Sequence, residues 1–248
     1  MSNLSIQRAI AVAFFLCCMT NCGPIIKSLG GLKNPKVTTL QEINAHVFRT
    51  FGSDSIIDLY TSTVWDSTEI MRIFFKSFDG SVNAFRTMDS RLMCFNNQAT
   101  CGPNQVSQLV DAGPISLVQA CSDSITKPMG YFGSWDSLLS ATKPLNEHDS
   151  LRLSKLDDYN PTYIFVFFWS TYLLNPKKRL AEFKLLANSL KDLGNDYRYE
   201  LIRINCDLRE DMGLKPQQKF KVKLRKNGNR TYEFSFGTLP WSNSSNNP

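Results

Sequence analysis

Residues 163–169, Tyr-Ile-Phe-Val-Phe-Phe-Trp, form a segment that is apolar at every position. Aromatic and β-branched residues are favoured in strands, and successive strand residues point to opposite faces of a sheet. A strand without polar residues is therefore buried on both faces, as at the centre of a parallel or mixed sheet that helices cover. The segment predicts a strand of this kind.

A helix and a second strand are predicted directly after this segment. Asn175 and Pro176 stand in the order of an N-cap residue and a first helical residue. Apolar residues then follow at helical spacing up to Gly194: Leu180, Phe183, Ala187 and Leu190. Residues 197–206 predict the second strand. A β-α-β unit of this kind places its two strands parallel to each other.

Two further strand patterns surround this unit. Residues 151–156, Leu-Arg-Leu-Ser-Lys-Leu, alternate between apolar and polar side chains and predict a strand. Residues 219–226 and 230–236 flank Asn227-Gly228, a strong signal for the turn of a β-hairpin. The order of these elements is strand, helix, strand and hairpin.

Residues 167–177, Phe-Phe-Trp-Ser-Thr-Tyr-Leu-Leu-Asn-Pro-Lys, resemble the surroundings of a thioredoxin active site. In that family a buried strand ends in an aromatic residue and a Cys-x-x-Cys motif opens the next helix. The order of the elements resembles the same framework. The two cysteine positions hold Leu173 and Pro176 here. The resemblance implies a degenerate thioredoxin-like domain over 151–238, used for packing and partner binding.

The preceding region, 38–150, is predicted to be an irregular α+β region. Thr39-x-x-Glu42 matches a capping box, and a helix of about twelve residues is expected after it. The apolar clusters within 53–85 fit either strands or buried helical turns. Short helices are expected over 104–112 and 134–142. With the C-terminal sheet, the chain is expected to be of the α+β or α/β class.

The start of the chain has the parts of a secretory signal. The α-amino group and Arg8 precede an apolar run over 9–16, which is shorter than the roughly 20 residues of a membrane-spanning helix. The residues before Cys22 resemble the looser lipoprotein boxes of Bacteroidota proteins, in which the cysteine is acylated and becomes the mature N-terminus. We therefore expect a signal peptide over 1–21, lipidation of Cys22, and a tether over 22–37.

This resemblance implies a location in the bacterial cell envelope, with the lipid inserted in the membrane. No acidic tract follows Cys22, which favours an outer-membrane anchor and a domain that faces the periplasm. Protein partners in an envelope complex are expected, and the polar tail 239–248 is expected to be flexible. The alternative is a secreted or cytosolic protein that happens to begin with an apolar segment.

A mature chain that starts at Cys22 has four other cysteines: Cys94, Cys101, Cys121 and Cys206. Disulfides persist in oxidising compartments, and four cysteines allow three pairings. A bridge between Cys94 and Cys101 is favoured because the polar loop between them can close. The alternative is a set of free buried thiols that act as small apolar side chains.

One face of the predicted strand 219–226 is basic. Lys219, Lys221, Lys223 and Arg225 alternate with apolar residues. This stripe could contact anionic lipid headgroups, an acidic glycan or an acidic protein. It could equally be a solvated face whose lysines prevent edge-to-edge association of strands.

No catalytic residue, metal site or cofactor site is predicted. The chain has two histidines, His46 and His148, and neither has a second ligand at metal-binding spacing. A phosphate-binding glycine loop and a nucleophile elbow are also absent, and nucleic acid is not an expected partner in the envelope.

The sequence favours a non-catalytic envelope lipoprotein that serves as an accessory or scaffold subunit of a membrane-associated complex. One alternative is a periplasmic thiol-disulfide oxidoreductase that uses Cys94 and Cys101, or Cys206. The other alternative is a lipoprotein that binds a glycan or another ligand.

Overall fold

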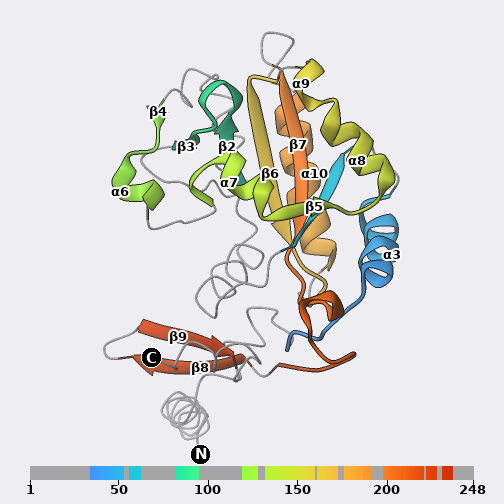
Figure 1. Ribbon diagram of the computed structural model, residues 1–248. Coiled ribbons are helices and arrows are strands. Elements are labelled where there is room, and N and C mark those ends of the chain that lie inside the picture. Colours follow the sequence, from blue (N-terminus) through green and yellow to red (C-terminus); the bar gives the residue numbers. More distant parts are fainter. Residues whose placement is uncertain are drawn as a thin grey trace, which may run out of the picture.

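The architecture is a mixed seven-stranded sheet with helices on both faces, which confirms the predicted α+β class (Figure 1). The computed structural model describes residues 34–52, 56–62, 82–94, 119–127, 132–159, 161–172, 176–191, 198–220, 222–227 and 231–236. Several expectations lie outside these ranges: the signal peptide, Cys22, the helix over 104–112 and the tail 239–248.

The strands of the sheet are β1 (Ile57–Thr61), β2 (Val82–Arg86), β3 (Leu92–Cys94), β4 (Gln119–Ala120), β5 (Thr142–Pro144), β6 (Tyr163–Trp169) and β7 (Tyr199–Asn205). Their spatial order is β4-β3-β2-β6-β7-β1-β5. The helices are α3 (Leu40–Phe51), α6 (Asp123–Thr126), α7 (Trp135–Ser140), α8 (Glu147–Ser154), α9 (Leu156–Tyr159) and α10 (Pro176–Lys191), with 3-10 turns η1 (Thr87–Asp89) and η4 (Glu210–Met212).

The central strand is β6, as predicted. It is buried at every position and pairs in parallel with β7, from Tyr163 opposite Tyr199 to Trp169 opposite Asn205. On its other side β6 pairs antiparallel with β2. β1 lies parallel to β7, beyond it in the sheet. The parallel β6-α10-β7 unit is therefore confirmed.

The alternation of β6 builds two apolar cores. Ile164, Val166 and Phe168 belong to one core, which also includes Trp135 and Leu138 of α7. Phe165, Phe167 and Trp169 belong to the other core, with residues of two helices: Ile43 and Val47 of α3, and Phe183, Leu186 and Leu190 of α10. Aromatic side chains on both faces of β6 explain why this strand carries no polar residue.

The predicted N-terminal starts of two helices are confirmed. The Thr39 hydroxyl accepts a hydrogen bond from the Glu42 N–H, and the Glu42 carboxylate accepts one from the Thr39 N–H, so the capping box of α3 is complete. Helix α7 starts after Ser134, whose hydroxyl accepts a hydrogen bond from the Ser137 N–H. Each start depends on a hydrogen bond between residues close in sequence, which is why a local pattern predicted it.

The predicted strand over 151–156 is wrong, because α8 and α9 occupy this segment. The Asn146 amide oxygen accepts a hydrogen bond from the Asp149 N–H and caps α8. Glu147 and Asp149 in its first turn and Arg152 in its last turn complement the helix dipole. The alternating pattern gave a wrong prediction because Leu151 is 56% exposed and is not part of a core.

The hairpin exists but does not join the large sheet. β8 (Val222–Asn227) and β9 (Thr231–Phe236) pair antiparallel and form a separate two-stranded sheet (Figure 1). The thioredoxin resemblance implied antiparallel strands from this hairpin beside the parallel pair. That position is taken by β2, which pairs with the free side of β6, and by β3 beyond it.

The fold is continuous across two of the predicted region boundaries. The large sheet takes strands from both 38–150 and 151–238, and the boundary between these regions falls inside α8. The end of the predicted tether is folded: the Val37 N–H donates to the Gln218 carbonyl at 2.8 Å, and the Val37 side chain is fully buried. The Phe220 N–H donates to the Pro35 carbonyl, so this segment lies along the chain that leads to β8.

Candidate functional site

The predicted bridge between Cys94 and Cys101 is corrected, because the structure pairs Cys94 with Cys121. Cys94 ends β3, and Cys121 directly follows β4, which pairs with β3 in the antiparallel register Met93 opposite Ala120. The two Cα atoms are 4.9 Å apart, and both side chains are buried. Strand pairing therefore brought together two cysteines that are distant in sequence, and Cys101 lies outside the described residues.

Cys206 is a free thiol at the end of β7, and it is 5% exposed. Burial raises the pKa of this thiol well above its usual value, and the neighbouring Asp207 carboxylate raises it further. The thiolate is the nucleophilic form of cysteine, so this environment keeps Cys206 unreactive.

The predicted basic stripe lies only partly in the described structure. Lys219 is exposed and pairs with Lys36 in an isolated antiparallel bridge, whereas Lys221 is outside the described residues. Lys223 and Arg225 are on β8, and the register places Glu233 of β9 opposite Arg225.

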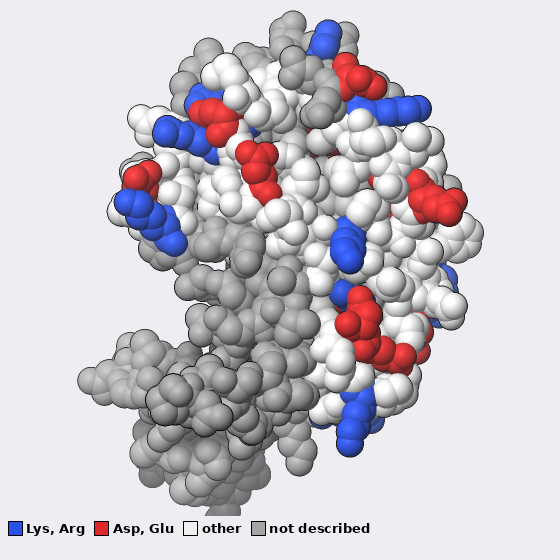
Figure 2. Space-filling view, in the orientation of Figure 1, with Lys and Arg blue, Asp and Glu red and all other residues white. Residues whose placement is uncertain are grey.

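Other charged groups are mixed on the surface. On the face shown in Figure 2, basic and acidic side chains of the described residues are interspersed, and neither kind gathers into a large patch. Within the described ranges, no helix is long and apolar enough to cross a membrane.

A buried polar network lies at the carboxyl ends of β6 and β7. The Asp207 carboxylate accepts hydrogen bonds from the Thr171 N–H and the Asn205 side-chain amide, both at 2.9 Å. Arg209 is 1% exposed, donates to Asp211 at 2.8 Å, and lies over the Tyr60 ring at 4.4 Å. Carboxyl ends of parallel strands are the usual ligand site of open α/β sheets. Here Asn205, Asp207 and Arg209 are buried, so the network joins the strand ends.

Asp207 makes the stability of the fold depend on pH. Burial raises the pKa of its carboxyl to about 6, although the hydrogen bonds from Asn205 and Thr171 oppose the rise. The folded state therefore holds this proton more tightly than the unfolded chain does. The stability that this provides is complete below the unfolded pKa near 3.8 and is lost as the pH rises through 6.

We expect the free energy of unfolding of the wild type to fall by about 2 kcal/mol between pH 4 and pH 7, relative to the variant Asp207→Asn. The amide of the variant does not titrate, so subtraction of the two pH profiles isolates Asp207. Urea unfolding of both proteins across this pH range measures the difference. Parallel profiles would show that Asp207 titrates normally.

A second buried network joins β1, β7 and α8. The Arg203 guanidinium donates to both oxygens of Asp58, at 2.8 and 2.6 Å, and lies 4.5 Å from the centre of the Phe51 ring. The Asp58 N–H donates to Asp149 at 3.1 Å. Burial raises the pKa of Asp149. Because all three charged residues are at most 5% exposed, this network has a structural role.

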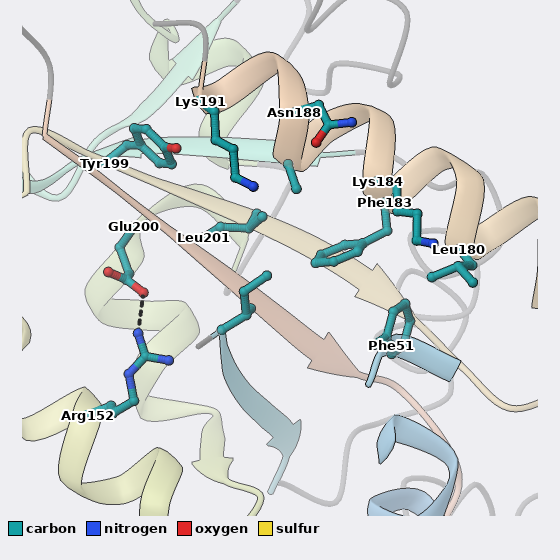
Figure 3. A pocket seen from close by; sticks show the side chains of 12 residues that line it. Phe51, Arg152, Leu180, Phe183, Lys184, Asn188, Lys191, Tyr199, Glu200 and Leu201 are labelled. Atoms are coloured by element: carbon teal, nitrogen blue, oxygen red, sulfur yellow. Dashed lines mark hydrogen bonds and ion pairs between the residues drawn. The ribbon is translucent and has the colours of Figure 1, made fainter. Parts of the chain in front are cut away.

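An open cavity lies beside this network, at the amino ends of β7 and β1. Its volume is about 460 Å³, within the range of small-molecule sites. It is lined by Phe51, Ile56, Arg152, Leu180, Phe183, Lys184, Ala187, Asn188, Lys191, Tyr199, Glu200 and Leu201. Figure 3 shows α10 on one side of the cavity and Arg152 of α8 on the other.

The lining combines an apolar base with charged groups. Phe183 and Leu201 are buried, whereas Lys184 and Lys191 are exposed. Arg152 forms an ion pair with Glu200 at 3.4 Å. Burial raises the pKa of Glu200, although Arg152 opposes the rise. Within the described residues, this cavity thus places apolar and charged side chains around one open space.

Comparison with known proteins found no matching family model, no matching curated protein and no matching solved structure.

The charged residues of the cavity were not predicted from the sequence. One signal was present: Lys184, Asn188 and Lys191 recur at intervals of four and three residues, which places them along one face of a helix. Arg152 and Glu200 have no such signal, because they are 48 residues apart and meet only through the packing of α8 against the sheet.

Proposed function

We propose that this protein is a non-catalytic, lipid-anchored protein of the bacterial envelope, and that it serves as an accessory or scaffold subunit of a membrane-associated complex. The observation that carries the proposal is the state of its cysteines. One pair forms a buried disulfide, and the remaining described thiol is buried and held protonated.

The disulfide supports the location. A bridge between Cys94 and Cys121 joins the neighbouring β3 and β4 segments of the sheet. Disulfides form and persist in oxidising compartments such as the bacterial periplasm, and they are rare in the reducing cytosol. The bridge thus agrees with export directed by the signal-like residues 1–21 and with acylation of Cys22.

The same cysteines argue against a thiol-disulfide oxidoreductase. Such enzymes use a low-pKa, accessible thiolate, commonly at a helix N-terminus. Helix α10 starts at Pro176, and the positions that resemble Cys-x-x-Cys hold Leu173 and Pro176. Cys206 is buried, and the environment opposes its ionisation.

A degenerate thioredoxin-like scaffold is the finer part of the proposal. The unit β6-α10-β7 with β1 beside it, and the antiparallel β2 and β3 on the other side of β6, support this assignment. Without the redox motif, a rigid sheet covered by helices offers surfaces for partner proteins.

The lipid anchor is tested by fractionation of a Bacteroidota host that expresses the full chain. We expect the wild type in the membrane fraction, with an intact mass that fits a chain acylated at Cys22. The variant Cys22→Ser should lose the acyl mass and leave the membrane, whereas Cys18→Ser, upstream of the expected cleavage, should behave as the wild type. A wild-type protein that is unacylated, or that still starts at Met1, would defeat the proposal.

The absence of redox catalysis is tested separately by an insulin-reduction assay on the purified protein. We expect no turnover above the rate of the reductant alone. Turnover that disappears in Cys206→Ala or in Cys94→Ala would establish the oxidoreductase instead.

A further inference from the structure

We propose that the cavity between α10 and α8 binds a small anionic amphiphile, a molecule with a carboxylate or phosphate group on an apolar body. This inference goes beyond the scaffold role and does not depend on the lipid anchor. It stands on the apolar base of the cavity and the excess of positive charge around it.

The base of the cavity is its apolar part. Phe183 and Leu201 are 4% and 6% exposed and belong to the core that also contains β6. Phe51 packs edge to face on Phe183, with ring centres 5.2 Å apart. These side chains are held by a helix or a strand packed on the sheet, so the apolar surface exists before a ligand arrives. A preformed apolar site lowers the ordering cost of binding.

The charged groups around this base favour an anion. Arg152, Lys184 and Lys191 provide three positive charges and Glu200 one negative charge, a formal total of +2 at the cavity. Lys184 and Lys191 are exposed, and neither forms an ion pair with any residue in the described part of the chain. In Figure 3 the Lys191 side chain extends from α10 toward Tyr199 and Leu201.

The guanidinium of Arg152 is only partly hydrogen-bonded within the described residues. It contacts Glu200 through one nitrogen at 3.4 Å, and its other terminal nitrogen is buried without a hydrogen-bond partner among the described residues. This nitrogen has almost no accessible surface, so a ligand in the cavity contacts it only if the Arg152 side chain turns.

Isothermal titration calorimetry of the purified protein tests the site with three probes of equal chain length: decanoate, decyl phosphate and decyltrimethylammonium. We expect at least one anion to bind with one-to-one stoichiometry, about tenfold or more tightly than the cation. The tighter anion identifies the preferred head group. Equal binding of all three probes, or no binding of either anion, would overturn the proposal.

Matched variants locate the binding. We expect the variant Lys184→Glu/Lys191→Glu to bind the anion about tenfold or more weakly, because it removes two cations from the cavity and adds two anions. The control Lys143→Glu/Lys215→Glu makes the same change of net charge at exposed lysines that do not line the cavity, and its affinity should stay at the wild-type value. An equal loss in both variants would show attraction to net charge alone and would contradict the site.

A third variant separates the apolar base from the charges. Ala187→Phe fills part of the cavity and keeps every charged group, so it should also abolish or strongly weaken anion binding. Thermal unfolding of each variant shows whether it is folded at the temperature of the titration. Undiminished binding by folded Ala187→Phe would place the ligand outside the cavity and defeat the proposal.

Discussion

The variant Arg203→Met is expected to lose about 3–5 kcal/mol of unfolding free energy, because it leaves the buried Asp58 carboxylate without its cation. Arg203 and Asp58 are 1% and 5% exposed, and two hydrogen bonds join them. Asp149 accepts from the Asp58 N–H, and the Arg203 charge also lowers the pKa of Asp149, so the variant would affect this second buried carboxyl as well. Urea unfolding of the wild type and the variant at neutral pH measures the loss.

A matched pair in the same protein provides the control. Arg86 and Asp89 form the same two-pronged ion pair, but their side chains are 27% and 29% exposed. We expect Arg86→Met to cost less than about 1 kcal/mol, because solvent screens an exposed pair. Similar losses for Arg203→Met and Arg86→Met would show that burial does not increase the cost of breaking the pair.

The double variant Asp58→Asn/Arg203→Met tests the cause of the loss. It removes the uncompensated charge together with the cation, so it should recover a large part of the stability that Arg203→Met loses. A double variant that is less stable than Arg203→Met would instead assign the loss to the missing packing of Arg203 on Phe51 and Phe183.

The variant Cys94→Ala/Cys121→Ala is expected to lose about 3–4 kcal/mol, because the disulfide restrains the unfolded chain over a separation of 27 residues. Reduction of the wild type should cause a similar loss. Unfolding of oxidised, reduced and variant protein in urea measures the effect. Peptide mapping without reductant should recover residues 94 and 121 in one linked fragment.

Two single variants control the disulfide experiment. Cys101→Ala should unfold as the wild type does, because Cys94 pairs with Cys121. Cys206→Ala should cost about 1 kcal/mol, the usual loss for a small truncation in a core. A large loss of unfolding free energy in Cys101→Ala would favour the pairing of Cys94 with Cys101 and contradict the structure.

Local patterns predicted the elements whose ends and faces depend on neighbouring residues. The apolar segment 163–169 predicted a strand buried on both faces, Pro176 predicted the start of α10, and Thr39 with Glu42 predicted the cap of α3. One local pattern failed because an apolar side chain is exposed to solvent. Leu151 is apolar but exposed, so the alternation over 151–156 does not mark the two faces of a strand, and a helix occupies most of this segment.

Long-range pairing could not be predicted in the same way. Backbone hydrogen bonds in a sheet carry little side-chain information, so nothing near residue 163 shows that β2 rather than the hairpin pairs with β6. The disulfide of Cys94 with Cys121 and the meeting of Arg152 with Glu200 follow from that arrangement. The chain thus encodes its strands, helices and caps in short segments. The cavity and the buried ion pair exist only after the sheet has formed, because each combines residues from several elements.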